Sequence, residues 1–413
     1  MLEVISFILG VIGLVVGIAA LPAITRQLER RRERRRLERH ALLDVPPPTM
    51  SAVERLCRDR LYYYRTDGWA RAIRLVGADA DLVPVGRLGV SYEDTPLILP
   101  PELREARDEI VRQRIATAEV SGYIFFDGPN TRLKGWRISP RDDNRVGREE
   151  NAMYLNLGPV SWYDFEGLNG AFRAHPETQR PEQLYEYYVG LSALLSDGRV
   201  EKSKLSNILD NAVTLVTNDG YVGYQRRSGR VSLGRDAFTS AVAENTNRFL
   251  DDARSDDPLF LYNREGSLRD APADYEPQGV PHPVAAVLRG IESEVSPVVR
   301  AKIDLKNVYV TGISFDLEGL HPSLLFVVLV GLSRREILSA RRNQPGAEYI
   351  EGMLNFVPID LEHEDTQSVL SQPYWIPSGQ ASLIRAAEVI RSLARSRGVS
   401  PLQVVTSLRN GVT

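Results

Sequence analysis

The sequence predicts an α+β fold with a mixed sheet, preceded by a smaller α+β region and one N-terminal transmembrane helix. Three observations predict it: an uncharged N-terminal segment, a glycine-containing hairpin signal near mid-chain, and two strongly apolar strand runs beyond an amphipathic helix. At 413 residues, the chain is long enough for two domains, or for one domain with accessory segments.

The N-terminal segment 4–24 has about twenty consecutive residues without a charge, enough to span a hydrocarbon core of about 30 Å. Glu3 precedes it and eight arginines follow it within residues 26–39, which is the reverse of a cleavable signal peptide. By the positive-inside rule, the arginines stay in the cytoplasm. We therefore predict a single-pass protein of the inner (cell) membrane, with its N-terminus outside and its body cytoplasmic.

Two partners are expected for this N-terminal part. The lipid bilayer is the first, because interleaved acids let residues 26–39 continue as a charged helix that can also hold anionic head groups. The second is another copy of the chain, because Gly13 and Gly17 form a GxxxG pattern that lets membrane helices pack closely. The alternative is that the two glycines have no role in packing, since glycine is common in membrane helices.

The charge of the remaining chain is acidic. Without those eight arginines, the three glutamates between them and Glu3, the chain keeps 43 basic and 50 acidic side chains, a net charge of −7. This balance argues against a nucleic acid as partner. The single cysteine, Cys57, excludes a disulfide framework or a cysteine metal cluster and fits a reducing compartment.

Composition shifts suggest six segments. Three prolines at 46–48 form a stiff spacer, and a second pattern of elements begins near residue 205. The expected segments are a transmembrane helix at 1–25, a basic juxtamembrane helix at 26–43, a proline-rich linker at 44–50, an N-terminal α+β region at 51–204, a second domain at 205–395 and a helical tail at 396–413.

Within 51–204, helices are predicted at 52–64, inside 99–115 and at 182–195, with a turn at 197–198. Between about 120 and 170 the pattern favours strands and turns. There, Trp162, Tyr163 and Phe165 could stack on a base, although aromatics beside a Gly-Pro pair more often fix a turn to a core. Asp164 and Asn169 are interpreted as structural for the same reason.

Within 205–395, Asn218-Asp219-Gly220 predicts a hairpin between strands at 212–216 and 221–225. Apolar residues at 284, 287, 288, 291 and 295 form one stripe of an amphipathic helix, which Pro297 ends. Strands are predicted at 308–316 and 323–332, the second buried at the centre of a sheet, and helices at 379–397 and 402–408.

The order of these elements resembles the Nudix family: a hairpin, an arginine pair, a long loop, one central helix, two strands, a helix and an acidic stretch before a final strand. The resemblance covers about 205–395, roughly half of the chain, in the segments TLVTNDGYVGYQRRS, AAVLRGIESEVS and GAEYIEGMLNFVPI. Upstream, NLGPVSWYDFEGLN is similar to the segment before the Nudix fold in the uridine-diphosphate-glucose-hydrolysing branch. The resemblance implies an α/β/α sandwich.

The family's box, GX5EX7REUXEEXGU, presents acids on one helix face to magnesium ions that hold a pyrophosphate. When Arg289 is aligned with the box arginine, Gly290 and Ser293 stand at acid positions and Glu294 is the one acid left on that face. Upstream of Arg289, the box glycine falls at Tyr275 and the first box glutamate falls at Pro281, so both are absent. We therefore expect Mg²⁺ binding to be lost, and Glu294 to be the remaining catalytic and metal-ligand candidate.

Two further groups of residues are candidates by the resemblance. Three carboxylates could restore a magnesium site. Glu348 and Glu351 are candidates because some family members use acids after the penultimate strand, and Glu244 is the third. Arg226 and Arg227 follow the first hairpin, where the family often grips phosphate, and with Arg289 they are the predicted ligand-binding residues. Ordinary surface charge is the alternative for all three arginines. His282 has no second histidine at ligand spacing and is interpreted as a loop residue.

Three functions remain open. The first is a membrane-anchored sensor or effector, whose degenerate Nudix-like domain binds a nucleotide or nucleotide-diphosphate derivative without efficient hydrolysis. The second is a divergent metal-dependent hydrolase of nucleoside-diphosphate sugars, which needs rescue of the missing acids. The third is a membrane-tethered interaction scaffold that inherits the fold.

Overall fold

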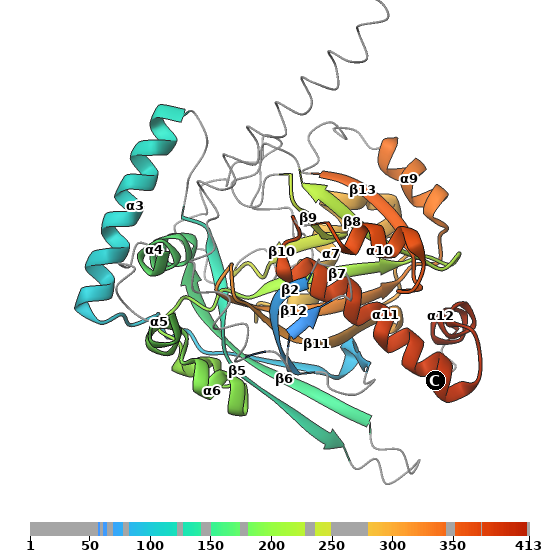
Figure 1. The fold of residues 1–413 in the computed structure, drawn as a ribbon, viewed down its shortest axis with the longest axis horizontal. Helices are drawn as coiled ribbons and strands as arrows, with labels where there is room; N and C mark the ends of the chain where they lie inside the picture. Colours follow the sequence, from blue (N-terminus) through green and yellow to red (C-terminus); the bar gives the residue numbers. More distant parts are fainter. Residues whose placement is uncertain are drawn as a thin grey trace, which may run out of the picture. The chain divides into compact units, whose positions relative to one another are not determined.

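The computed structural model describes residues 57, 61–63, 69–76, 82–121, 127–141, 150–173, 181–227, 236–248, 280–343, 352–372 and 374–410 (Figure 1). Contacts divide the chain into Met1–Ser51 and Ala52–Thr413, and all of these residues belong to the second unit. The predicted transmembrane helix with Gly13 and Gly17, the basic helix and the linker all lie in the first unit, outside the described residues. Among the residues described, no helix is both long and apolar enough to cross a bilayer.

A mixed ten-stranded sheet forms the centre of the described unit, with the strand order β1-β2-β11-β12-β7-β8-β13. Strands β3, β9 and β10 pair with β11, β8 and β7, and the β12–β7 pair is parallel. The strands are β1 Leu61–Tyr63, β2 Trp69–Val76, β3 Val83–Pro84, β7 Asp210–Val216, β8 Tyr221–Arg227, β9 Phe238–Ser240, β10 Val242–Asn245, β11 Val308–Asp316, β12 His321–Leu329 and β13 Gly352–Pro358. Because β1, β2 and β3 come from segment 51–204, the sheet runs across the expected boundary at residue 204.

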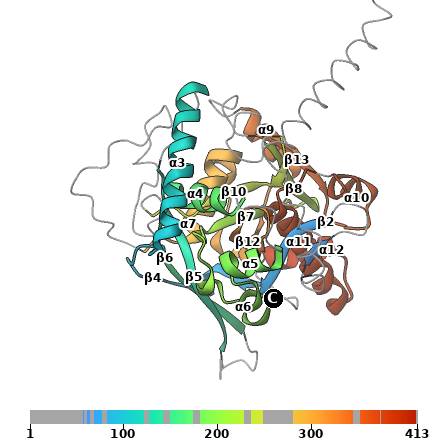
Figure 2. The same ribbon diagram turned by 60° about the vertical axis from the view of Figure 1, so that its left-hand side comes forward.

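Helices cover both faces of this sheet (Figures 1 and 2). On one face lies α11, Pro377–Arg397, whose Ser382 contacts the Thr214 hydroxyl at 2.9 Å and donates to the Ala212 carbonyl at 2.9 Å. On the other lies α7, Pro283–Gly290, which contacts β10 and β7. The opposite placement follows from the alternation of side chains along β7. The central sheet is therefore the middle of three layers.

A three-stranded sheet accompanies the central one, with the order β4-β6-β5. Beside it, α3 packs against α4, where a Cβ at Gly167 would meet the Arg107 side chain at 2.5 Å. The remaining elements are β4 Leu88–Tyr92, α3 Pro101–Ser121, β5 Pro129–Arg141, β6 Glu150–Ser161, α4 Trp162–Arg173, α5 Pro181–Val189, α6 Leu191–Asp197, α8 Pro297–Arg300, α9 Arg334–Arg342, α10 Glu364–Leu370 and α12 Pro401–Arg409, with short helical turns at Val85–Arg87, Val200–Lys202, Ile291–Val295 and Leu305–Asn307.

The predicted mixed α and β composition and mixed sheets are confirmed. So are the hairpin strands, the two apolar strands with β12 buried, and the helices that became α3, α7, α11 and α12. The helix expected at 52–64 is wrong at its end, because Leu61–Tyr63 pairs with β2 as a strand. The helix expected at 182–195 is broken by Gly190, whose φ of 65° ends α5 and begins α6.

The strands and turns expected between about 120 and 170 are wrong at their end, because Trp162–Arg173 is the helix α4. The Ser161 hydroxyl accepts the Asp164 N–H at 3.1 Å, while the Asp164 carboxylate accepts the Ser161 N–H at 3.3 Å. This reciprocal pair satisfies two backbone donors that a helix start leaves open. Ser161 and Asp164 therefore begin a helix, although the preceding Gly158-Pro159 pair favoured a turn in the sequence.

Candidate functional site

The two arginines of the predicted phosphate grip point to opposite faces of the central sheet. Along β8, Gln225 and Arg227 share the α7 face, whereas Tyr224 and Arg226 share the α11 face. Tyr224 marks the second face, because its ring lies 6.0 Å from that of Trp375 in the core cluster with α11. Arg226 and Arg227 therefore cannot hold one phosphate together from the same face.

Helix α7 begins at His282, whose Nδ1 accepts the Val284 N–H at 3.2 Å. Burial lowers the pKa of His282, which keeps its ring neutral and able to accept this hydrogen bond. The predicted loop histidine is thus a helix N-cap. The apolar stripe of α7 and the turn after it buries Val287, Ile291 and Val295 completely, and this fixes which side chains face the sheet.

Gly290, at the first acid position of the box, lies directly against β10. A Cβ placed on it would meet Val242 Cγ1 at 2.4 Å and Glu244 Cγ at 2.7 Å. Both distances are shorter than Cβ contacts in proteins, so a glutamate could not stand there without moving α7 away from the strand. The space that a box acid needs is filled by the two β10 side chains.

Arg289 pairs with Glu244 across this contact. Its guanidinium lies 3.1 Å from the Glu244 carboxylate and donates to the Asn245 carbonyl at 3.2 Å. The side chains are 10% and 23% exposed, so the pair is largely withdrawn from water. Glu244, predicted as a rescuing metal ligand, is instead the ion-pair partner of the box arginine.

Glu294 is joined to the sheet by Gln225, whose Nε2 donates to Glu294 Oε2 at 3.0 Å and also to the Ala241 carbonyl. Arg341 of α9 is close by and donates to the Gly352 carbonyl at 2.5 Å. Burial lowers the pKa of Arg341, and the negative charge of Glu294 opposes that shift. Glu294 is thus flanked by an amide and a guanidinium.

These residues form what we call the α7-face cluster: Gln225, Arg227, Glu244, Arg289, Glu294 and Arg341. It combines three arginines with two carboxylates, which favours an anion over a cation. Magnesium requires several carboxylate or carbonyl oxygens directed at one point, but both glutamates here are engaged by arginine or amide donors. The described residues therefore do not fit Mg²⁺. The other two predicted carboxylates, Glu348 and Glu351, lie outside the described residues.

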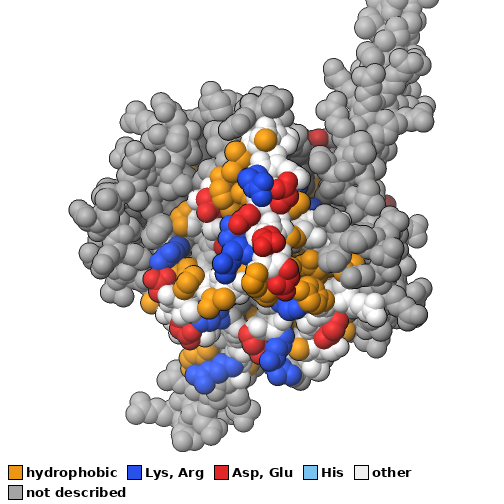
Figure 3. Space-filling model, turned by 90° about the vertical axis from the view of Figure 1, so that its left-hand side faces the viewer, with side chains coloured by type: hydrophobic (Ala, Val, Ile, Leu, Met, Phe, Trp, Pro, Cys, Tyr) orange, Lys and Arg blue, Asp and Glu red, His pale blue; other side chains and the backbone are white. Residues whose placement is uncertain are grey.

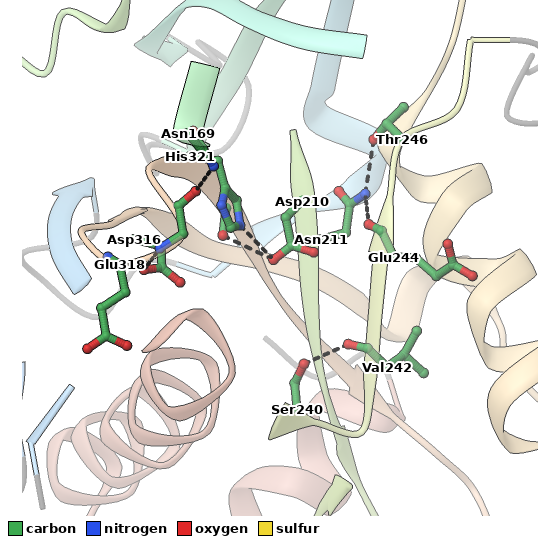
Figure 4. A network of polar contacts seen from close by, with 12 residues as sticks. Asn169, Asp210, Asn211, Ser240, Val242, Glu244, Thr246, Asp316, Glu318 and His321 are labelled. Atoms are coloured by element: carbon green, nitrogen blue, oxygen red, sulfur yellow. Dashed lines mark hydrogen bonds and ion pairs between the residues drawn. The ribbon is translucent and has the colours of Figure 1, made fainter. Parts of the chain in front are cut away.

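A second polar cluster lies at the β11–β12 hairpin and includes Asp210 of β7 (Figure 4). The His321 imidazole lies 3.9 Å from the Asp210 carboxylate, which also accepts the Ser323 hydroxyl at 3.0 Å. Burial alone lowers the pKa of His321, but the contact with Asp210 and the charges of Asp316 and Asp210 outweigh it and raise the pKa to about 9. His321 is therefore a buried cation at neutral pH.

Asp316 shapes the hairpin itself. Its Oδ1 accepts the backbone N–H groups of Glu318 and Gly319, both at 2.7 Å. Burial raises the pKa of Asp316, while the charge of His321 acts against that shift.

The network of Asp210, Asp316, His321 and Ser323, which we call the hairpin cluster, was not predicted from the sequence. The available signal was the Asp316–His321 pair, which brackets the four-residue turn between two strongly predicted strands.

Side chains of α4 and α5 hold three consecutive carbonyls of the same hairpin. Tyr185 donates to Leu317, Arg173 to Glu318 and Asn169 to Gly319, at 3.0, 3.0 and 2.8 Å. The structural interpretation of Asn169 is thus confirmed. These bonds join segment 51–204 to the central sheet.

Of the SWYDF aromatics, Phe165 is buried, and the partly buried Trp162 packs against the same core cluster. The ring centroid of Phe165 lies 5.0 Å from that of Trp162 and 5.6 Å from that of His321, and Phe165 also belongs to a core cluster with Val160 and Ile208. This favours the packing interpretation over base stacking. Asp164, besides capping α4, forms an ion pair with Arg107 of α3 at 3.2 Å, so its role is structural as predicted.

Two cavities open elsewhere on the described unit. One, of about 510 Å³, lies on the β4-β6-β5 sheet, where the Arg137 guanidinium stands 4.6 Å from the Tyr154 ring centroid. The other, of about 560 Å³, lies beside α5 and α6. Neither is lined by a residue of the α7-face cluster.

No protein-family model matches this chain. No curated protein matches it either. The resemblance to the Nudix family thus rests on the residues and spacing of the quoted sequence segments alone.

Proposed function

We propose that the chain is a membrane-anchored cytoplasmic sensor or effector, whose Nudix-like domain binds a nucleotide or nucleotide-diphosphate derivative without efficient hydrolysis. The observation that carries this proposal is Gly290. Its contact with Val242 and Glu244 fills the place of a box acid, so the helix sits too close to β10 for the family's metal site.

Support for ligand binding comes from the charges that surround this contact. Arg227, Arg289 and Arg341 outnumber the two glutamates, and Arg289 and Arg341 are 10% or less exposed. A diphosphate that exchanges places with Glu244 or Glu294 would receive charge-assisted hydrogen bonds from these arginines. Such an exchange would link ligand binding to the position of α7, which is what a sensor needs.

Binding is tested with the full chain in detergent, titrated calorimetrically with a panel of nucleoside-diphosphate derivatives. Arg227→Ala is expected to weaken binding about tenfold, since a hydrogen bond to a charged group contributes about 1.5–3 kcal/mol. Arg226→Ala is the matched control, because it removes the same side chain from the opposite face of the same strand. Equal losses in both variants would contradict binding at the α7-face cluster.

Hydrolysis is tested with the same panel in the presence of Mg²⁺ by chromatography of the products. We expect no turnover above the rate without protein. Turnover that Glu294→Gln abolishes and Glu292→Gln preserves would establish the hydrolase alternative instead. If no compound raises the unfolding temperature of the full chain, the scaffold alternative is favoured over both.

A further inference from the structure

A basic hollow lies beside α5 and α6, in a part of the molecule that the proposed function does not use. Its volume is about 560 Å³, within the range of small-molecule sites. Three of its lining residues, Arg199, Lys202 and Lys204, are cationic. All three come from residues 199–204, a short segment that passes beside Gly190 between α5 and α6.

Gly190 brings this segment close to the helices. It takes the left-handed conformation between α5 and α6, and a Cβ on it would meet the Lys202 Cβ at 3.0 Å. The carbonyl of Tyr188 then accepts the Lys204 N–H at 2.8 Å and the Ser203 hydroxyl at 3.2 Å. The backbone at residues 202–204 is thereby fixed against α5, so the lysines are held at the hollow.

Among the residues that line the hollow, three cations stand against one carboxylate. The Lys204 ammonium lies 3.2 Å from the centroid of the Tyr187 ring, a contact that orients the charge without neutralising it. Glu186 is the acid among the lining residues, and its carboxylate accepts the Ser192 N–H at 2.7 Å at the start of α6. The hollow therefore presents positive charge to solvent.

Hydroxyl groups complete the donor set. Ser192 and Ser196 are four residues apart on α6, so both lie on the side of the helix that lines the hollow. Ammonium, guanidinium and hydroxyl groups are the donors that phosphate oxygens accept. Figure 3, which looks at the side of Figure 1 that carries α3 and α5, shows basic and acidic side chains intermixed over the described surface.

We propose that the basic hollow binds a phosphate-bearing ligand, supplied either by a soluble phosphate compound or by the head group of an anionic lipid. The exposure of Arg199 and Lys202 predicts affinity that falls as salt concentration rises. This site is separate from the α7-face cluster, so either proposal can fail without the other.

The soluble source is tested with inorganic pyrophosphate and the full chain in detergent, in an Arg227→Ala background that weakens binding at the α7-face cluster about tenfold. Calorimetry is expected to give an affinity about tenfold weaker for Lys202→Glu. Arg397→Glu, the same charge reversal at an exposed residue of α11, is expected to leave the affinity unchanged. Lys202→Gln, which removes the charge without reversing it, checks that a loss is not caused by misfolding.

The lipid source is tested with the full chain reconstituted in nanodiscs of phosphatidylcholine, with and without phosphatidylglycerol, by hydrogen–deuterium exchange over residues 186–204. Protection that appears with phosphatidylglycerol assigns the hollow to a head group. Protection by pyrophosphate alone assigns it to a soluble ligand. Absence of protection in both arms, or protection that persists in Lys202→Glu, would overturn the proposal.

Discussion

The α7-face cluster and the hairpin cluster are both built from arginine or histidine cations and carboxylates, but they differ in what surrounds the charges. In the first, the side chain of Glu244 is 23% exposed, while that of its partner Arg289 is 10% exposed. In the second, the side chains of Asp210 and His321 are 11% and 13% exposed, and Asp316 is buried beneath its own turn. The proposed function requires that the more exposed carboxylate of the first cluster can give way to a ligand anion, whereas we expect the second cluster to be a fixed part of the fold.

Both clusters also show how charges withdrawn from water are matched, since a buried charge without a partner is costly. In the α7-face cluster, Gln225, Arg289 and Arg341 lie around the carboxylates of Glu294 and Glu244. In the hairpin cluster, the charges of Asp210 and Asp316 both act on His321.

The largest expected effect separates the two clusters directly. Asp210→Ala leaves the His321 cation without its nearest carboxylate and the Ser323 hydroxyl without its acceptor, and should lower the free energy of unfolding by about 3 kcal/mol. Glu244→Ala removes a more exposed partner and should cost about 1 kcal/mol. Urea unfolding of the full chain at pH 7 measures both. Equal losses would remove the distinction between a fixed and an exchangeable cluster.

A pH titration sharpens the same comparison. The folded-state pKa of His321, about 9, exceeds its ordinary value of 6.5, so the protonated ring stabilises the fold. That stability is fully present below pH 6.5 and is lost as pH rises through 9, by an amount of about 3 kcal/mol. Urea midpoints between pH 6 and 9.5 measure it. His321→Gln should flatten the profile in this window, while Glu244→Gln should leave its shape unchanged, and a flat wild-type profile would contradict a buried imidazolium.

Four strands of the central sheet, β7, β8, β11 and β12, were predictable because their signals are local. Runs rich in Val, Ile and aromatic residues mark β11 and β12, and Asn218-Asp219-Gly220 marks the hairpin before β8. The pairing of charges was not predictable, because Asp210 and His321 are more than a hundred residues apart and meet only through the parallel β7–β12 pair. The pairing of β2 and β3 with β11 was not predictable either, because these strands are also far apart in the sequence.

Four of the six residues of the α7-face cluster, Arg227, Glu244, Arg289 and Glu294, were candidates from the sequence, whereas Gln225, Arg341 and the geometry of the cluster were not predicted. Arg289 and Glu294 lie on the predicted helix, yet spacing alone does not show that Arg289 pairs with Glu244 or that Arg226 and Arg227 face opposite ways. The second point follows from strand alternation once Arg226 and Arg227 are known to lie inside β8, rather than in the loop after it.

The smallest expected effect tests the contact on which the proposed function depends. Gly290→Ala places a Cβ within 2.4 Å of Val242 Cγ1, and crowding of this kind costs about 1–3 kcal/mol. Alanine is better than glycine in a helix by about 1 kcal/mol, so a net destabilisation of about 1 kcal/mol is expected. Gly86→Ala is the matched control, because nothing lies within 4 Å of a Cβ there, and it should be neutral or slightly stabilising. If Gly290→Ala were as stable as Gly86→Ala in urea unfolding, α7 would have room to move from β10, and the place of the box acid would be open to a metal-binding side chain.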